Sequence, residues 1–189
     1  MNPDIQRELI PRDDALHLIG ALDGMQTKLL DAAEQWQLLD DTGHVPASPA
    51  YAELIQHAAA AQALSRDVVQ LTADFARTAH STNRAGSAVL AHLATAATMS
   101  SHAAPHFAET AETVLSLSRS SGPADRQYKE GRMVIGHATA RAYLRRTSES
   151  LGDAVEELNV HLVFHRFFPT PSRRESPAPP PPRPGARHR

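Results

Sequence analysis

Apolar side chains recur in this chain at alternating steps of three and four residues. Such spacing brings them to one seam of a helix that packs as helices do in a coiled coil. A half-buried strand would instead show a two-residue period, and no stretch of the chain does. The pattern therefore predicts an all-α protein. The first seam consists of Ala15, Leu18, Leu22, Met25, Leu29, Ala32, Trp36 and Leu39.

The same spacing continues in three further segments, which turn-prone residues separate. Gly43 and Pro46 end the first segment, and Pro49 opens the second. The polar stretch HSTNRAGS (80–87) divides the second from the third, with one continuous helix as the alternative, and SSGPAD (120–125) precedes the fourth. We expect short connections to make successive helices antiparallel, in an up-down bundle of about four long helices. The expected helices span 13–41, 49–80, 86–119 and 124–167.

Three residues interrupt these helical patterns. Gly20 and Gly24 lie inside the first predicted helix, where each weakens it by about 1 kcal/mol relative to Ala. We expect close approach of a neighbouring helix to compensate. Pro105 lies inside the third, which it is expected to kink or divide.

Length and composition indicate one helical domain, 1–168, followed by a tail, 169–189. The tail holds mostly Pro, Arg, Ser and Ala, so we expect it to be disordered, with polyproline II character. The chain has no cysteine, which excludes disulfides, zinc–thiolate sites, iron–sulfur clusters and cysteine nucleophiles. The first fourteen residues show no signal peptide, and we expect a cytoplasmic protein.

The segment 85–108 contains no Asp, Glu, Lys or Arg and is long enough to cross a bilayer. It consists mainly of Ala, Thr, Ser and His, whereas membrane spans are rich in Leu, Ile, Val and Phe. We therefore predict a buried alanine-rich helix and no membrane association.

Histidines are numerous and are the candidate metal ligands. His102 with His106, and His161 with His165, are spaced four apart on helices, and Glu157 extends the second pair. Antiparallel registers also bring His57, His106 and His137 to one layer, with Glu34 nearby. Eleven histidines on four helices produce such coincidences without a function, and the Glu-x-x-His pairs of di-iron bundles are missing. We predict no metal site and no cofactor.

Basic residues on the fourth predicted helix are candidate nucleic-acid contacts. A nucleic-acid-binding helix gathers its cations on one face, but these six spread all round the helix. The acidic first helix can neutralise them if the first and last helices are neighbours. The six are Arg126, Lys129, Arg132, Arg141, Arg145 and Arg146.

Motifs of catalysis are missing from the sequence. It has no glycine-rich phosphate loop, no His-Glu-x-x-His and no Gly-x-Ser-x-Gly. We predict that the protein is not an enzyme and has no catalytic residues.

The tail is the candidate partner-binding element. Four consecutive prolines before an arginine resemble a ligand for an aromatic-lined proline groove. A solubilising appendage is the alternative reading, and a basic tail that does function suits an acidic partner. The candidate residues are Pro179, Pro180, Pro181, Pro182 and Arg183.

These patterns favour a non-catalytic interaction or scaffold protein that acts through helix–helix packing, with a protein partner or with another copy of itself. The third predicted helix is poor in large side chains, so burial within one chain is small and a second subunit can add to it. A nucleic-acid-associated accessory protein that uses the basic helix and tail is the alternative. A metal-binding helical bundle is the third reading.

Overall fold

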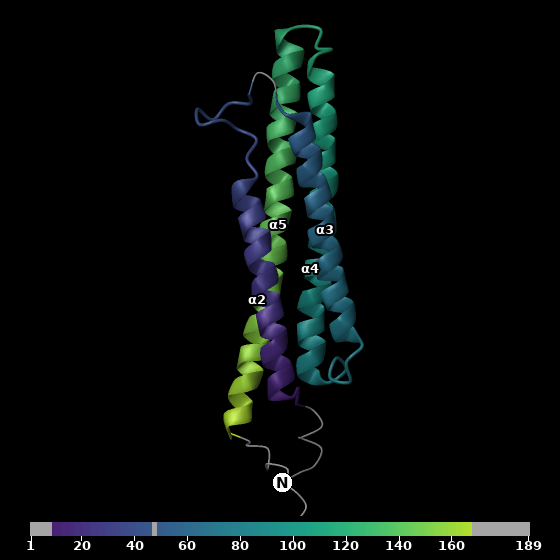
Figure 1. The fold of residues 1–189 in the computed structure, drawn as a ribbon, viewed down its shortest axis with the longest axis vertical. Helices are drawn as coiled ribbons and strands as arrows, with labels where there is room; N and C mark the ends of the chain where they lie inside the picture. The colour runs from purple at the N-terminus through teal and green to yellow at the C-terminus, as the bar shows by residue number, and fades with distance from the viewer. Residues whose placement is uncertain (1–8, 47–48, 168–189) are drawn as a thin grey trace, which may run out of the picture.

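The computed structural model describes residues 9–46 and 49–167, apart from the side chains of 165–167. Within these residues the chain forms four α-helices and no strand, which confirms the predicted all-α bundle. Figure 1 shows the helices running along one long axis, each antiparallel to the next in the chain. They are α2 (Arg12–Gln35), α3 (Tyr51–Ala76), α4 (Arg84–Leu117) and α5 (Pro123–Phe167). The tail 169–189 lies outside the described residues.

The helices differ in length, and the longer two extend past the others. At 1.5 Å per residue, α5 is about 67 Å long and α4 about 51 Å, whereas α2 and α3 are each below about 40 Å. The α4–α5 hairpin therefore projects at the end that carries its turn (Figure 1). A small second core joins this projection to the 36–50 connection; its buried members are Leu38, Leu54, Ala111, Leu117 and Met133.

The first helix ends six residues earlier than the sequence predicted. Trp36 has an extended backbone, although its N–H still donates to the carbonyl of Ala32. The carboxylate of Asp40 then accepts hydrogen bonds from the backbone N–H groups of Thr42 and His44, 2.9 and 3.1 Å away. This local turn competes with helix formation. Leu39 consequently leaves the predicted seam and is exposed, and Leu38 is buried instead. The other helix ends fall within four residues of prediction.

The expected division of the third helix and the expected close approach at two glycines are both wrong. Pro105 does not divide α4, which is continuous from Arg84 to Leu117. Its ring lies on the exposed face, where the carbonyl that loses its helical partner can accept from water. Gly20 and Gly24 are not sites of close helix approach, since a Cβ built at either meets no atom within 4 Å.

The turn between α3 and α4 depends on two residues. Asn83 caps α4 by accepting a hydrogen bond from the backbone N–H of Gly86 at 2.7 Å. Gly86 packs so closely on the preceding turn that an added Cβ would lie 1.9 Å from the carbonyl oxygen of His80. Helices α3 and α4 are therefore separate.

The core runs along the axis where α4 and α5 face each other and their neighbours. Helix α4 packs against α3 and α5, and α5 packs against α2. Fully buried side chains recur on α5 at coiled-coil-like steps, as at Leu144, Leu151 and Leu158. Helices α2 and α3 are not among the closely packed pairs. The bundle is thus open along one boundary.

Substituting Gly86 tests the α3–α4 turn. We expect Gly86→Ala to lower the free energy of unfolding by about 2–3 kcal/mol, because the methyl group overlaps backbone atoms that cannot move aside. Urea denaturation followed by circular dichroism measures the change. Gly24→Ala is the matched control, and it should stabilise by up to about 1 kcal/mol through helix propensity. Equal effects of the two substitutions would contradict this account of the turn.

Candidate functional site

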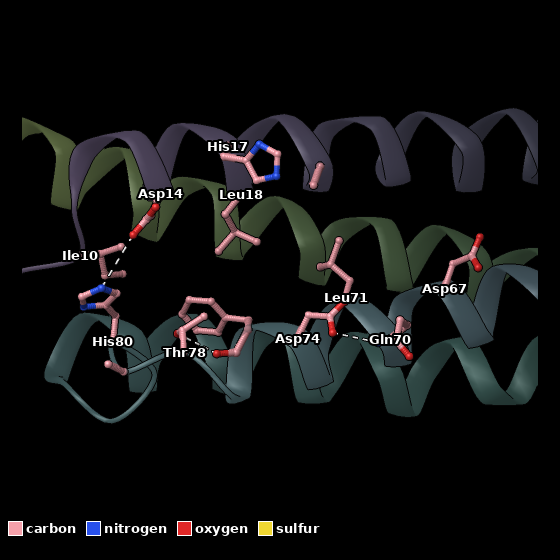
Figure 2. A pocket seen from close by; sticks show the side chains of 13 residues that line it. Ile10, Asp14, His17, Leu18, Asp67, Gln70, Leu71, Asp74, Thr78 and His80 are labelled. Atoms are coloured by element: carbon pink, nitrogen blue, oxygen red, sulfur yellow. Dashed lines mark hydrogen bonds and ion pairs between the residues drawn. The ribbon is translucent and has the colours of Figure 1, made fainter.

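The open boundary between α2 and α3 forms a groove with a volume of about 610 Å³. This volume falls in the range of ligand pockets, about 300–1,000 Å³. Figure 2 shows Leu18 of α2 and Leu71 of α3 directed toward the space between the two helices. The lining residues, hereafter the α2–α3 groove, are Ile10, Asp14, His17, Leu18, Ala21, Asp67, Gln70, Leu71, Asp74, Phe75, Thr78, Ala79 and His80.

The apolar part of the groove comes from the helical seams themselves. Leu18 and Leu71 occupy predicted seam positions, yet both are only half-buried because no facing helix covers them. Phe75 is 6% exposed and forms the deeper wall. Seam residues that normally fill a helix interface are here accessible from outside.

The charged part of the groove is acidic. Asp14, Asp67 and Asp74 line it together with His17 and His80, and no Lys or Arg does. Asp74 accepts a hydrogen bond from Gln70 at 2.8 Å and forms an ion pair with Arg77. Carboxylates beside an apolar channel favour a ligand that is apolar and positively charged.

Two contacts close the groove at the end that holds the α3–α4 turn. His80 Nε2 lies 3.8 Å from a carboxylate oxygen of Asp14, an ion pair when His80 is protonated (Figure 2). The backbone N–H of Ile10 donates to Nε2 of buried His161 on α5, at 2.9 Å. This end of the groove therefore lies beside the last turns of α5.

Aromatic side chains close the α2–α3 boundary nearer the 36–50 connection. The rings of Trp36 and His57 are stacked, with centroids 4.9 Å apart. Phe107 packs edge-on against both, and His137 lies 5.2 Å from Phe107 and 6.3 Å from His57 between ring centroids. Four helical segments thus meet in one aromatic layer.

The expected histidine layer is partly observed. His57 and His137 lie together, but His106 points elsewhere and stacks on Tyr143 with centroids 5.6 Å apart. His106 precedes the buried Phe107 and is therefore rotated about 100° from it around the helix axis. This rotation explains why His106 does not join the layer of His57 and His137. His102 joins His106 on Tyr143, and Glu34 is exposed.

Both core histidines are uncharged at neutral pH. Burial, and to a lesser extent the positive charge of Arg141 and the nearby His57, together lower the pKa of His137 to about 4. Burial also lowers the pKa of His57, against a smaller opposing effect of Glu53. Nδ1 of His57 and Nε2 of His137 are buried and lack a hydrogen-bond partner within the described part of the chain.

Metal ligation finds no support in the ranges that the structure describes. No three His, Asp or Glu side chains there are arranged to hold a metal ion. His161 is engaged with Ile10, and the side chain of His165 lies outside the described set.

The six basic residues of α5 divide into two groups. Arg126 pairs with Glu130 and Lys129 with Asp125, at 2.8 and 3.0 Å. Arg141 donates from Nε to the carbonyl of Ala33 and from Nη1 to Gln37, at 2.5 and 2.9 Å. The exposed remainder has no hydrogen bond or ion pair with the described residues; it comprises Arg132, Arg145 and Arg146. A nucleic-acid role for these residues stays a prediction.

The tail candidates Pro179–Pro182 and Arg183 lie outside the described residues. Among the described helices, none combines the length and apolarity that crossing a bilayer requires. Comparison with known proteins places the chain in no family, because no family model, curated protein or solved structure matches it significantly.

Protonation of the aromatic layer should destabilise the protein in acid. The pKa of His137 is lower in the folded chain than the ordinary 6.5, so the unfolded chain binds the proton first. Stability is then complete above pH 6.5 and falls toward pH 4, by on the order of 3 kcal/mol for this residue. We expect His137→Leu to reduce this slope, measured by urea denaturation at pH 7.5 to 4.5. His102→Gln, an exposed control, should leave the slope unchanged.

Proposed function

We propose that this protein is a non-catalytic interaction protein whose α2–α3 groove binds an amphipathic, positively charged helix of a protein partner. The observation that carries the proposal is the groove itself, an apolar channel between two antiparallel helices with three aspartates and no Lys or Arg in its lining. A helix is the occupant that this geometry suits, because α2 and α3 present seam residues at helical spacing.

The dimensions support a helix of modest length. The α2 residues that line the groove run from Asp14 to Ala21, a rise of about 11 Å at 1.5 Å per residue, and Ile10 extends the lining just before the helix begins. A partner helix of about three to four turns covers that distance. Apolar residues at i, i+3, i+4 and i+7 would pack on Leu18, Leu71 and Phe75.

The acidic lining supplies the selectivity. Lys or Arg side chains beside the apolar stripe would face Asp14 and Asp67, while an acidic helix would meet like charge. Salt should weaken binding, since exposed charge pairs are screened. Basic partners are therefore favoured over acidic ones of equal hydrophobicity.

A designed peptide tests this function. We expect an 18-residue helical peptide with a Leu stripe and Lys flanks to bind the full chain, as measured by isothermal titration calorimetry. Asp14→Asn, Asp67→Asn and Asp74→Asn together should weaken binding about tenfold or more. The matched control neutralises Asp23, Asp31 and Glu112, which are exposed and outside the groove, and should bind as the wild type does.

Two results would contradict the proposal. One is equal binding of the Lys-flanked peptide and a Glu-flanked version with the same Leu stripe. The other is a dimer of the chain in sedimentation equilibrium that the groove triple variant alone abolishes, because the groove would then be occupied by a second copy.

A further inference from the structure

We infer that the segment 168–189 of this chain binds its own α2–α3 groove and thereby competes with the partner. The inference rests on the proposed function, because it assigns an internal competitor to the same groove. It joins three observations: the charge division of the chain, the place where α5 ends, and the reach of the segment.

Charge is divided unequally along the sequence. Five arginines and one glutamate give residues 169–189 a formal charge of +4. Because the whole chain has a formal charge of −2, residues 1–168 have a formal charge of −6. The groove lining contributes three of the carboxylates that remain on the helical part. The segment therefore has the sign of charge that the groove selects.

The segment begins beside the groove. His161 contacts Ile10, and Ile10 lines the groove at its α3–α4 end. Phe167, where α5 ends, lies six residues beyond His161, about 9 Å farther along the helix axis. The start of the segment and the α3–α4 end of the groove are thus neighbours in space.

The segment is long enough to run along the groove. At about 3.1 Å per residue in polyproline II, Arg173 and Arg174 can lie about 19–22 Å from Phe167, within reach of Asp14. Arg183 lies about 28 Å farther, which exceeds the about 14 Å that separates Ala76, the last residue of α3, from Asp67 along that helix. Between these arginines stand the prolines 177 and 179–182, whose rings can pack on Leu18, Leu71 and Phe75.

An intramolecular ligand needs little intrinsic affinity. A tether of this length gives a local concentration in the millimolar range, so weak contacts suffice to occupy the groove. If the segment occupies the groove about nine-tenths of the time, a partner binds the chain about tenfold more weakly than it binds an open groove. The segment would then set the affinity that a partner must exceed to displace it from the groove.

Spin labels test the contact without any partner. The chain has no cysteine, so an introduced pair is labelled uniquely. One label is placed at Ala63→Cys, which is exposed on α3 one turn before Asp67, and the other at Ser176→Cys. We expect double electron–electron resonance at low salt to give a narrow distribution of the distance between the two labels. Ala94→Cys, exposed on α4, replaces Ala63→Cys in the control and should give a broad one.

Charge variants assign the contact to the groove. Replacing the five tail arginines with Ser, or Asp14, Asp67 and Asp74 with Asn, should broaden the Ala63–Ser176 distribution. The control replaces five exposed arginines outside the groove with Ser, and should leave it narrow; these are Arg84, Arg119, Arg132, Arg145 and Arg146. A broad distribution that no variant changes overturns the inference. So does a narrow one that tenfold dilution with unlabelled chain abolishes, since the contact would then be between molecules.

Peptide binding separates this inference from the proposed function. The Lys-flanked peptide should bind the tail-Ser variant about tenfold more tightly than the wild-type chain. Equal binding to both, with broad label distances, overturns the inference and leaves the proposed function standing. No binding to the tail-Ser variant, with narrow distances in the wild type, overturns the proposed function and leaves the contact of the segment with the groove.

Discussion

The attachment of α2 to α5 is the interaction on which the rest of this structure depends. Because α2 and α3 are not closely packed, α2 is held to the bundle chiefly along one side. Its buried residues, such as Leu22 and Leu29, face a core that α5 completes with Leu144 and Leu151. Loss of the α5 interface would leave the first helix without a support.

Polar contacts fix the register of this pairing. Gln26 donates to the carbonyl of Ser148 at 2.9 Å, and Arg141 donates to the carbonyl of Ala33. Seven residues forward on α2 therefore correspond to seven residues back on α5, as antiparallel helices with a heptad-like seam require. Arg141 also brings a positive charge to the end of α2, whose last turn has no basic residue of its own. The expected charge complementarity between the first and last helices thus takes the form of hydrogen bonds that Arg141 donates to the carbonyl of Ala33 and to the side-chain oxygen of Gln37.

Sequence periodicity was sufficient for the helices but not for their pairing. The steps of three and four predicted Leu22, Leu29, Val68 and Leu151 as core, and all four are fully buried. Periodicity describes one face of one helix and carries no information on the distance from that face to a neighbouring helix. Leu18 and Leu71 match the pattern as well as Leu22 does, yet they line an open groove. The acidic character of the groove was equally hidden, because Asp14 and Asp67 come together only through the arrangement of α2 and α3.

The histidines show that sequence register predicts the height of a residue along the bundle but not the direction in which its side chain points. Register alone placed His57 and His137 in one layer, because both occupy inward positions on helices that meet near Phe107. His106 failed because its rotation about the α4 axis, and not its height along the bundle, decides what it touches. Two titratable contacts nevertheless close the α2–α3 boundary in opposite ways: Trp36 stacks on a neutral, buried His57, whereas Asp14 pairs with His80 only when that ring is protonated. Protonation of the buried His57 therefore weakens the closure beside the 36–50 connection, and the groove lies between the Asp14–His80 contact and the middle of the bundle.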